Sequence, residues 1–234
     1  MKNELIFNCS ELGRVMANGR AKESIGKDAM TMLWEKKVME KYGRRKLFFS
    51  KFTRKGNLME EKNIVNYFEF RLIKNPDAIP LVKNEEKFDN GWVKGYPDLL
   101  DKLPPNASEV VDIKSSWDLW TFLQSELTPA YKWQGIGYCW LTGARTFKLT
   151  YVLESAPLTL IDDEVRRNSY QLDDPDDPDQ YADMVEKVQR NMTFDDIPLK
   201  DRVREFVYDV TDDDIEQLKE RITELRSLYQ GIEI

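Results

Sequence analysis

The sequence predicts an α/β (α+β) fold in which a mixed central β-sheet is flanked by helices. Apolar residues recur at helical spacing in several long segments, and short alternating or apolar runs lie between turn residues. The two kinds of segment follow each other as helices, strands, helices and a strand. With 234 residues and 41% hydrophobic residues, the chain can bury a substantial core, and we predict a single domain over residues 1–234.

The first quarter is predicted to be helical. Ser10 is expected to be the N-cap of a short helix over 11–17, because a serine hydroxyl accepts a hydrogen bond from a free N–H of the first turn. A longer helix is expected over 24–42, where Gly43 supplies the stop.

A third helix is expected over 53–73, because an Asn-Pro pair at 75–76 prevents its continuation. Its expected apolar set consists of Leu58, Ile64, Val65, Phe68 and Leu72.

Strand patterns begin after this helix. Residues 81–88 and 92–101 are predicted strands joined by the turn sequence at 89–91, and 109–114 is a third strand with a buried centre. These three strands are expected to form a meander. The later predicted elements are helices over 117–125 and 129–141, strands over 146–153 and 203–209, and a last helix that opens at 211–214 and carries an apolar stripe of Ile215, Leu218, Ile222, Leu225 and Leu228.

The composition excludes several kinds of site. The chain has no histidine, so a Ser-His-Asp triad, a Cys-His dyad and a His-ligated zinc are impossible. Its two cysteines cannot hold a four-cysteine zinc or an iron–sulfur cluster within one chain. An enzyme with this sequence must use carboxylates, lysine, tyrosine or a hard metal ion.

The expected environment is cytoplasmic. Two cysteines far apart in the sequence fit a reducing compartment. No apolar run approaches the roughly 18 residues of a membrane span, and the first residues lead into no apolar signal segment. We therefore expect no membrane partner.

Charge is unevenly distributed along the chain. Residues 1–60 hold fourteen Lys and Arg against seven Asp and Glu, whereas residues 154–234 hold ten against twenty-three. A basic first quarter fits a phosphate-binding surface, although a solvated helical face is the simpler interpretation of charge alone. The acidic last third argues against nonspecific wrapping of nucleic acid, and its densest run, 173–179, is predicted to be a solvated loop.

Asp98, Asp112 and Lys114 are the residues most suggestive of chemistry. In a strand, Asp112 and Lys114 point to the same face, while Val111 and Ile113 are expected to enter the core. A turn between the two segments makes them plausible antiparallel neighbours, so Asp98 can approach Asp112.

Two close carboxylates repel each other unless a cation lies between them. Oxygen ligands favour Mg²⁺ or Mn²⁺, and a neighbouring lysine can orient or activate water, or offset charge on a phosphate oxygen. These groups suit metal-assisted hydrolysis of a phosphodiester without histidine.

The sequence resembles the PD-(D/E)xK nuclease superfamily. Pro97-Asp98 followed by Asp112-x-Lys114 matches its signature in the expected order. Lys55-Gly56-Asn57-Leu58-Met59-Glu60 is similar to its helix motif with a metal-site glutamate. Gln134 and Tyr138 match the Gln-x-x-x-Tyr motif of the RecB-type and lambda-exonuclease-type (YqaJ-like viral recombinase) branch. The segment 9–16 also resembles the first helix of phage members, and the resemblance is specific over about 53–140.

The resemblance implies a restriction-endonuclease-like core over about 53–153, with a helical N-terminal part over 1–52 and an acidic extension over 154–234. It implies Asp98 and Asp112 as metal ligands, helped by the carbonyl of Ile113. Glu60 would be an outer or second-metal ligand, and we prefer it to Glu61 because of its spacing from Gly56.

In the same family, Lys114 would position or activate the attacking water, and Gln134 and Tyr138 would hold the DNA backbone. Arg14 and Lys55, both in the basic first quarter, are further candidates for DNA contact. Without cysteines for a cluster, the chain is most similar to the cluster-free viral exonucleases, which implies Mg²⁺ or Mn²⁺, DNA as partner, a possible single-strand annealing protein and a possible ring-shaped homo-oligomer.

Three alternatives remain open at this stage. The first is an endonuclease of the same fold, either restriction-like or structure-specific. The second is a catalytically silent DNA-binding module, which the intact Asp98, Asp112 and Lys114 disfavour. The third is a helical interaction protein built on the acidic C-terminal third.

Overall fold

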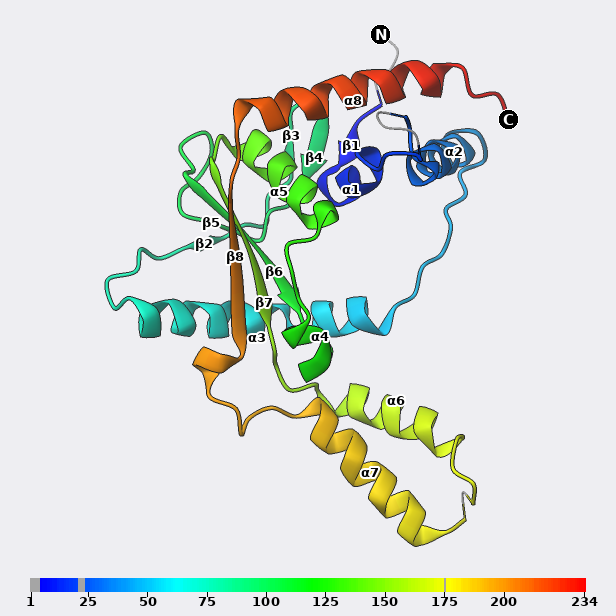
Figure 1. Cartoon of the computed structure of the whole chain (residues 1–234), viewed down its shortest axis with the longest axis vertical. Coiled ribbons are helices and arrows are strands. Elements are labelled where there is room, and N and C mark those ends of the chain that lie inside the picture. The colour runs from blue at the N-terminus through cyan, green and yellow to red at the C-terminus, as the bar shows by residue number, and fades with distance from the viewer. Residues whose placement is uncertain (1–4, 21–23, 175) are drawn as a thin grey trace.

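The centre of the molecule is a mixed five-stranded β-sheet (Figure 1). The computed structural model describes residues 5–20, 24–174 and 176–234. The strand order is β2-β5-β6-β7-β8, with β6 and β7 parallel and the other neighbours antiparallel. The predicted mixed sheet is therefore confirmed. Its strands are β2 (Val82–Lys83), β5 (Leu99–Leu100), β6 (Glu109–Ser115), β7 (Thr146–Val152) and β8 (Val203–Asp209).

Helices cover both faces of this sheet. Helix α5 (Pro129–Thr142) connects the parallel strands β6 and β7 and packs on one face, as a parallel pair requires. Helix α3 (Lys51–Lys74) packs on the other face. Val110 joins the core on the α5 side and Val111 the core on the α3 side, so β6 is buried on both faces. The outer elements on the α5 side are α1 (Leu12–Val15), α2 (Lys27–Tyr42) and α8 (Asp212–Gln230).

The expected three-strand meander is divided between two sheets. The turn at 89–91 does form a hairpin, with Gly91 at a φ of 82°, between β3 (Phe88–Asp89) and β4 (Val93–Gly95). That hairpin pairs with β1 (Phe7–Asn8) in a separate three-stranded sheet. Strands β2 and β5 instead join the central sheet. The chain leaves the hairpin after Gly95, and β5 then pairs with β6 on one side and with β2 on the other.

The predicted N-cap at Ser10 is wrong. The first helical turn is η1 (Cys9–Glu11), and the Glu11 carboxylate accepts a hydrogen bond of 2.9 Å from the backbone N–H of Asn8. Asn8 is therefore the capping position, and the exposed Ser10 is left to line a cleft. The longer helix ends as predicted at Gly43, which has a φ of 64°.

The third helix forms as predicted, but its predicted buried face is only partly right. Helix α3 begins after Ser50, whose hydroxyl accepts a hydrogen bond from the N–H of Phe52. Leu58, Val65 and Leu72 are more than half exposed. The polar Lys55 and Asn63 occupy buried positions that the hydrophobic pattern assigns to the surface; the full buried set is Lys55, Met59, Asn63, Ile64, Tyr67 and Phe70.

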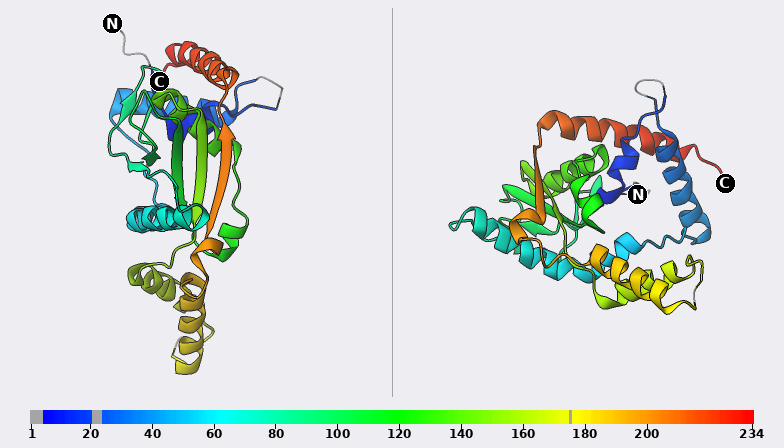
Figure 2. Two further views of the ribbon diagram at one scale, coloured as in Figure 1. Left: turned by 90° about the vertical axis from the view of Figure 1, so that its left-hand side faces the viewer. Right: turned by 60° about the horizontal axis from the view of Figure 1, so that its bottom comes forward.

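The acidic third contains a helical hairpin that projects beyond the sheet (Figures 1 and 2). It consists of α6 (Leu158–Ser169) and α7 (Pro178–Met192), neither of which the sequence predicts. The run 173–179 forms turns up to Asp177, which caps α7; residue 175 lies outside the described residues. Strand β8 and the capping box of α8 at Thr211 and Asp214 are confirmed. The remaining short helices are α4 (Leu119–Leu123) and η2 (Leu199–Asp201).

Across 5–20, 24–174 and 176–234, none of the helices is both long and apolar enough to cross a membrane.

We predict that Gly135→Ala lowers the free energy of unfolding by about 1–3 kcal/mol, because overpacking a tight contact costs about that much. An added Cβ at Gly135 would lie 2.1 Å from the Phe147 ring of β7. Urea denaturation measures the change. Gly56→Ala on α3 is the control: its Cβ would meet nothing within 4 Å, so stability should rise by about 0.5–1 kcal/mol. Equal effects of the two substitutions would contradict the packing argument.

Candidate active site

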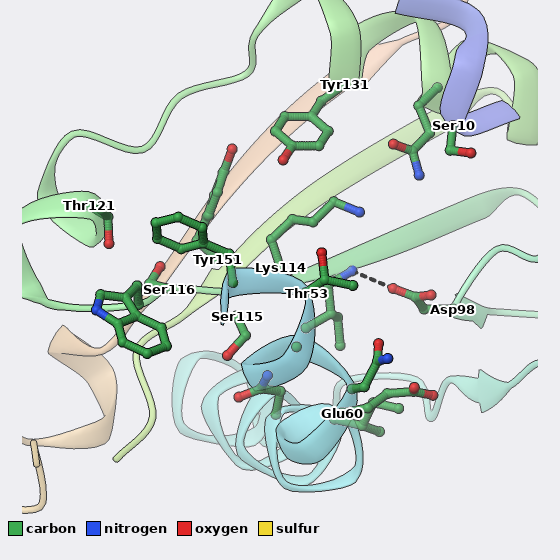
Figure 3. Close-up of a pocket in the computed structure, with 18 residues that line it drawn as sticks. Ser10, Thr53, Glu60, Asp98, Lys114, Ser115, Ser116, Thr121, Tyr131 and Tyr151 are labelled. Atoms are coloured by element: carbon green, nitrogen blue, oxygen red, sulfur yellow. Dashed lines mark hydrogen bonds between the residues drawn. The ribbon is translucent and has the colours of Figure 1, made fainter. Parts of the chain in front are cut away.

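Asp98 and Asp112 are brought together by the antiparallel pairing of β5 with β6. Leu99 pairs with Val111, so Asp98, one residue before β5, lies beside the middle of β6. The carboxylate Oδ2 of Asp98 accepts a hydrogen bond of 2.7 Å from the backbone N–H of Ile113 (Figure 3). This bond fixes Asp98 against the strand that carries Asp112 and Lys114.

Asp112 is held from two sides. The ammonium of Lys114, two residues along the same strand face, lies 2.6 Å from Oδ2 of Asp112. The amide of Gln134 on α5 donates to Oδ1 of Asp112 at 3.2 Å. Asp112 is only 2% exposed, although the sequence assigned burial to its neighbours Val111 and Ile113, because α5 covers this face as well.

Gln134 and Tyr138 have different roles in the structure. They lie four residues apart on α5, and Nε2 of Gln134 donates to the Tyr138 hydroxyl at 3.0 Å. Gln134 lines the cleft described below, whereas the buried Tyr138 does not. Tyr138 therefore orients Gln134 in this structure and does not itself face the cleft.

The site holds two carboxylates against one close ammonium. Burial, reinforced by the charge of Asp112, raises the pKa of Asp98 to about 7, despite the Ile113 N–H and Lys114. Burial works to lower the pKa of Lys114, but its charge and hydrogen-bond interactions with Asp112 outweigh this and the pKa is raised. Lys114 is therefore an ammonium that can donate hydrogen bonds and stabilise negative charge at neutral pH.

The donor set fits a hard divalent cation. Two buried carboxylates that repel each other gain from a positive charge between them, and oxygen donors suit Mg²⁺ or Mn²⁺. Within the part of the chain that the structure describes, no group of three or more Asp, Glu, Cys or His side chains is arranged to hold a metal ion. The geometry therefore offers two carboxylates for a metal, with no preassembled third.

Glu60 lies at the edge of the site. It lines the cleft with Asp98, and its charge helps to raise the Asp98 pKa. Its carboxylate is 3.5 Å from the Lys83 ammonium, and its side chain is 55% exposed. Glu61 also pairs with Lys83 but does not line the cleft, so Glu60 is the one of the two that shares the cleft with Asp98.

A cleft of about 730 Å³ surrounds these groups, within the range of small-molecule sites. Its walls come from α3, the end of β6, α4 and α5. Sequence reasoning missed several lining residues that carry no motif: Ser10, Thr53, Asn63, Ser115, Ser116, Tyr131 and Tyr151. Asn63 is the one with a sequence signal, since it lies three residues after Glu60 on the same predicted helix.

Two predicted DNA contacts are not at the cleft. Lys55 is 1% exposed, and its ammonium donates to the carbonyls of Ser116 and Trp117 at 2.8 and 3.0 Å. Burial lowers the pKa of Lys55 to about 8. Arg14 forms a 2.8 Å ion pair with Glu35 between α1 and α2. The structure thus gives Lys55 a structural position rather than a place on an open surface.

Comparison with known proteins shows similarity in structure rather than in sequence. No protein-family model and no curated protein matches the chain. The phage related exonuclease from Haemophilus somnus 129PT superposes with a TM-score of 0.74 at 22% identity, covering 97% of this chain and 95% of that one. The alkaline exonuclease LHK-Exo from Laribacter hongkongensis has a TM-score of 0.61 at 11% identity, covering 97% and 88%.

LHK-Exo in complex with dAMP is similar to the same extent, with a TM-score of 0.59, 12% identity and coverage of 97% and 88%. These similarities extend over nearly the whole chain, including the N-terminal and acidic parts that flank the motifs. They confirm, at the level of the fold, the resemblance that Asp98, Asp112 and Lys114 indicated in the sequence.

We predict that Asp98→Asn is more stable than the wild type at pH 8 in EDTA, by roughly 2–4 kcal/mol. The folded pKa of about 7 lies above the ordinary 3.8, so the folded protein binds this proton more tightly than the unfolded chain does. Stability is therefore lost as pH rises from about 4 to about 7, and the substitution removes that loss.

Urea denaturation at pH 4.5 and pH 8 measures this difference. The advantage of Asp98→Asn should shrink towards pH 4.5, where Asp98 is protonated in the folded protein. Asp162→Asn, at an exposed position of α6, is the control. A stability advantage that is the same at both pH values would show that burial of the charge is not its cause.

Proposed function

We propose that this chain is a metal-dependent DNA nuclease that hydrolyses phosphodiester bonds, and more specifically an exonuclease acting on DNA ends in recombination or end processing. The observation that carries the proposal is that Asp98 and Lys114 line one cleft, with Asp112 buried directly behind them and paired with Lys114. The exonuclease part is supported by the fold shared with two exonucleases over 97% of the chain, one of which binds the DNA mononucleotide dAMP.

Asp98, Asp112 and the Ile113 carbonyl would hold Mg²⁺ or Mn²⁺, with Glu60 as an outer or second-metal ligand. When bound, the metal supplies Lewis-acid polarisation of a phosphoryl oxygen and a more acidic water. Lys114, as an ammonium, donates a hydrogen bond that orients the attacking water or offsets charge on the phosphate. Gln134 fixes the orientation of Asp112, and Tyr138 fixes that of Gln134.

The segment 43–50, which links α2 to α3, supplies cations for the DNA backbone. Arg44, Arg45 and Lys46 are exposed and have no ion-pair partner among the described residues. The segment leads into the start of α3 (Figure 1). Phe52 and Thr53, in the first turn of this helix, line the cleft. Phosphates bound along this segment would therefore lead towards Asp98 and Asp112.

An endonuclease of the same fold and a catalytically silent DNA-binding module are the alternatives that the experiments below separate. A cytoplasmic location in bacteria or phage-infected cells, a single-strand annealing partner and a homo-oligomer stay predictions from the family resemblance.

We predict that the protein degrades linear duplex DNA in Mg²⁺ but leaves covalently closed circles intact, because an exonuclease requires an end. Asp112→Asn should lower the rate at least about 100-fold by removing a metal ligand. A gel time course with Mg²⁺ or EDTA measures both effects. Cuts in the circle would indicate the endonuclease, and metal-dependent DNA binding without any cleavage would favour the silent module.

We predict that DNA affinity falls with salt and that the triple variant Arg44→Ala, Arg45→Ala, Lys46→Ala weakens this dependence. The slope of log K against log[salt] should become less negative by about 2–3, since each lost phosphate contact removes about 0.9. Fluorescence anisotropy with a labelled duplex measures the slope. The control triple changes the exposed Lys74, Lys87 and Lys102, none of which lines the cleft; an equal change there would contradict the assignment.

A further inference from the structure

Asn63 is a buried amide whose carbonyl oxygen lacks a hydrogen-bond partner among the described residues. Its side chain is 2% exposed, yet it lines the cleft from α3, one turn beyond Glu60. Leaving such a group unpaired costs about 1–3 kcal/mol, so a donor on a molecule that enters the cleft would bind favourably to it. The catalytic arrangement of Asp98, Asp112 and Lys114 makes no use of it.

Two hydroxyls at the end of β6 also lack a hydrogen-bond partner among the described residues. The Oγ atoms of Ser115 and Ser116 are buried, line the cleft and have no hydrogen-bond partner in the part of the chain that the structure describes. They follow Lys114 directly in the sequence. Figure 3 shows Ser115 pointing towards α3, the helix that carries Asn63. One end of the cleft thus carries an amide oxygen and two hydroxyls that find no hydrogen-bond partner among the described residues.

Gly56 leaves open space beside these groups. It lies within α3, lines the cleft, and a Cβ at this position would meet nothing within 4 Å. Its φ is not positive, so the backbone does not require glycine. Glycine in a helix interior costs about 0.5–1 kcal/mol relative to alanine. Gly56 and Asn63 are seven residues apart and therefore share one face of the helix.

These groups are neutral and include both donors and acceptors, and the side chains of Phe52, Ile64 and Ile113 add apolar wall. A phosphate would need free cations here, but the Lys55 ammonium is already bound by the carbonyls of Ser116 and Trp117, and that of Lys114 by Asp112. The carboxylates of Asp98 and Glu60 add negative charge to the cleft. A flat heteroaromatic ring with a polar edge matches the set, since an amide pairs with the donor and acceptor of a base edge.

We propose that the α3 side of the cleft is a subsite for the nucleobase next to the scissile phosphate, which approaches α3 at Gly56 and hydrogen-bonds to Asn63 and to Ser115 or Ser116. This inference rests on the proposed nuclease function. It assigns Asn63 and Gly56 as positioning residues that act on the base and not on the phosphate.

The first test is Gly56→Ala assayed on two linear duplexes. One has ordinary ends, and the other carries abasic nucleotides at both ends of one strand. On ordinary ends, the added methyl group should make the first turnover of Gly56→Ala about tenfold slower than that of the wild type. On the abasic duplex, the variant and the wild type should cleave at the same rate. Equal rates for wild type and variant on ordinary ends would overturn the subsite.

The second test is Asn63→Leu, which keeps the size and removes the amide. Loss of a hydrogen bond to a neutral group corresponds to about threefold to tenfold slower cleavage of ordinary ends, with no change on abasic ends. Asn191→Leu, at an exposed position of α7 outside the cleft, is the matched control. If Asn63→Leu changed both substrates equally, or neither, the amide would be satisfied by water or serve packing only, and the proposal would fail.

Equilibrium binding separates failure of this inference from failure of the nuclease proposal. Calorimetry compares dAMP, dCMP, dGMP and dTMP with 2-deoxyribose 5-phosphate in Mg²⁺. The wild type should bind at least one of the four more tightly than the baseless sugar phosphate, and Asn63→Leu and Gly56→Ala should weaken only the base-bearing ligands. This result would support the subsite even if no DNA were cleaved, whereas equal affinity for all five ligands would overturn it even in an active nuclease.

Discussion

The buried pair Asp98 and Asp112 is the constraint on which the rest of the structure depends. Two carboxylates in one poorly solvated place repel each other, and the Lys114 ammonium, the Gln134 amide and the Ile113 N–H compensate for this only in part. The antiparallel register of β5 against β6 makes the pair possible, because it sets Leu99 opposite Val111. The burial of β6 between α3 and α5 holds the two carboxylates in place despite their repulsion.

Helices α5 and α3 both face the cleft, and their glycines have opposite effects on it. On α5, a Cβ at Gly135 would collide with Phe147 and one at Gly137 with Leu12, so their absence lets α5 pack tightly and brings Gln134 onto Asp112. On α3, Gly56 faces open space, so its missing side chain enlarges the cleft. Glycine therefore lets α5 pack closely on β6, whereas on α3 it leaves the cleft wider.

The strand β6, which carries the candidate site, could be predicted from sequence because its evidence is local. A two-residue period places Asp112 and Lys114 on one face, and the short turn before them brings Asp98 alongside. The buried face of α3 could not be predicted, because Lys55 and Asn63 are polar. Lys55 is buried because the carbonyls of Ser116 and Trp117 accept its hydrogen bonds, and Asn63 because it lines a cleft formed with distant strands. Helices α6 and α7 also escaped prediction, since their apolar contacts are with each other and with Trp117.

The charge count of the first quarter overstates the surface available to DNA, because the fold neutralises much of it. On α3, Lys51 pairs with Glu164 and Arg54 with Asp163, so α6 binds two cations that flank the cleft-lining Phe52 and Thr53. Within the described chain, the segment 43–50 keeps its cations free of such partners. The acidic third thus neutralises cations beside the cleft, and in the proposed function a polyanion would approach along the segment 43–50, past Phe52 and Thr53 towards Asp98.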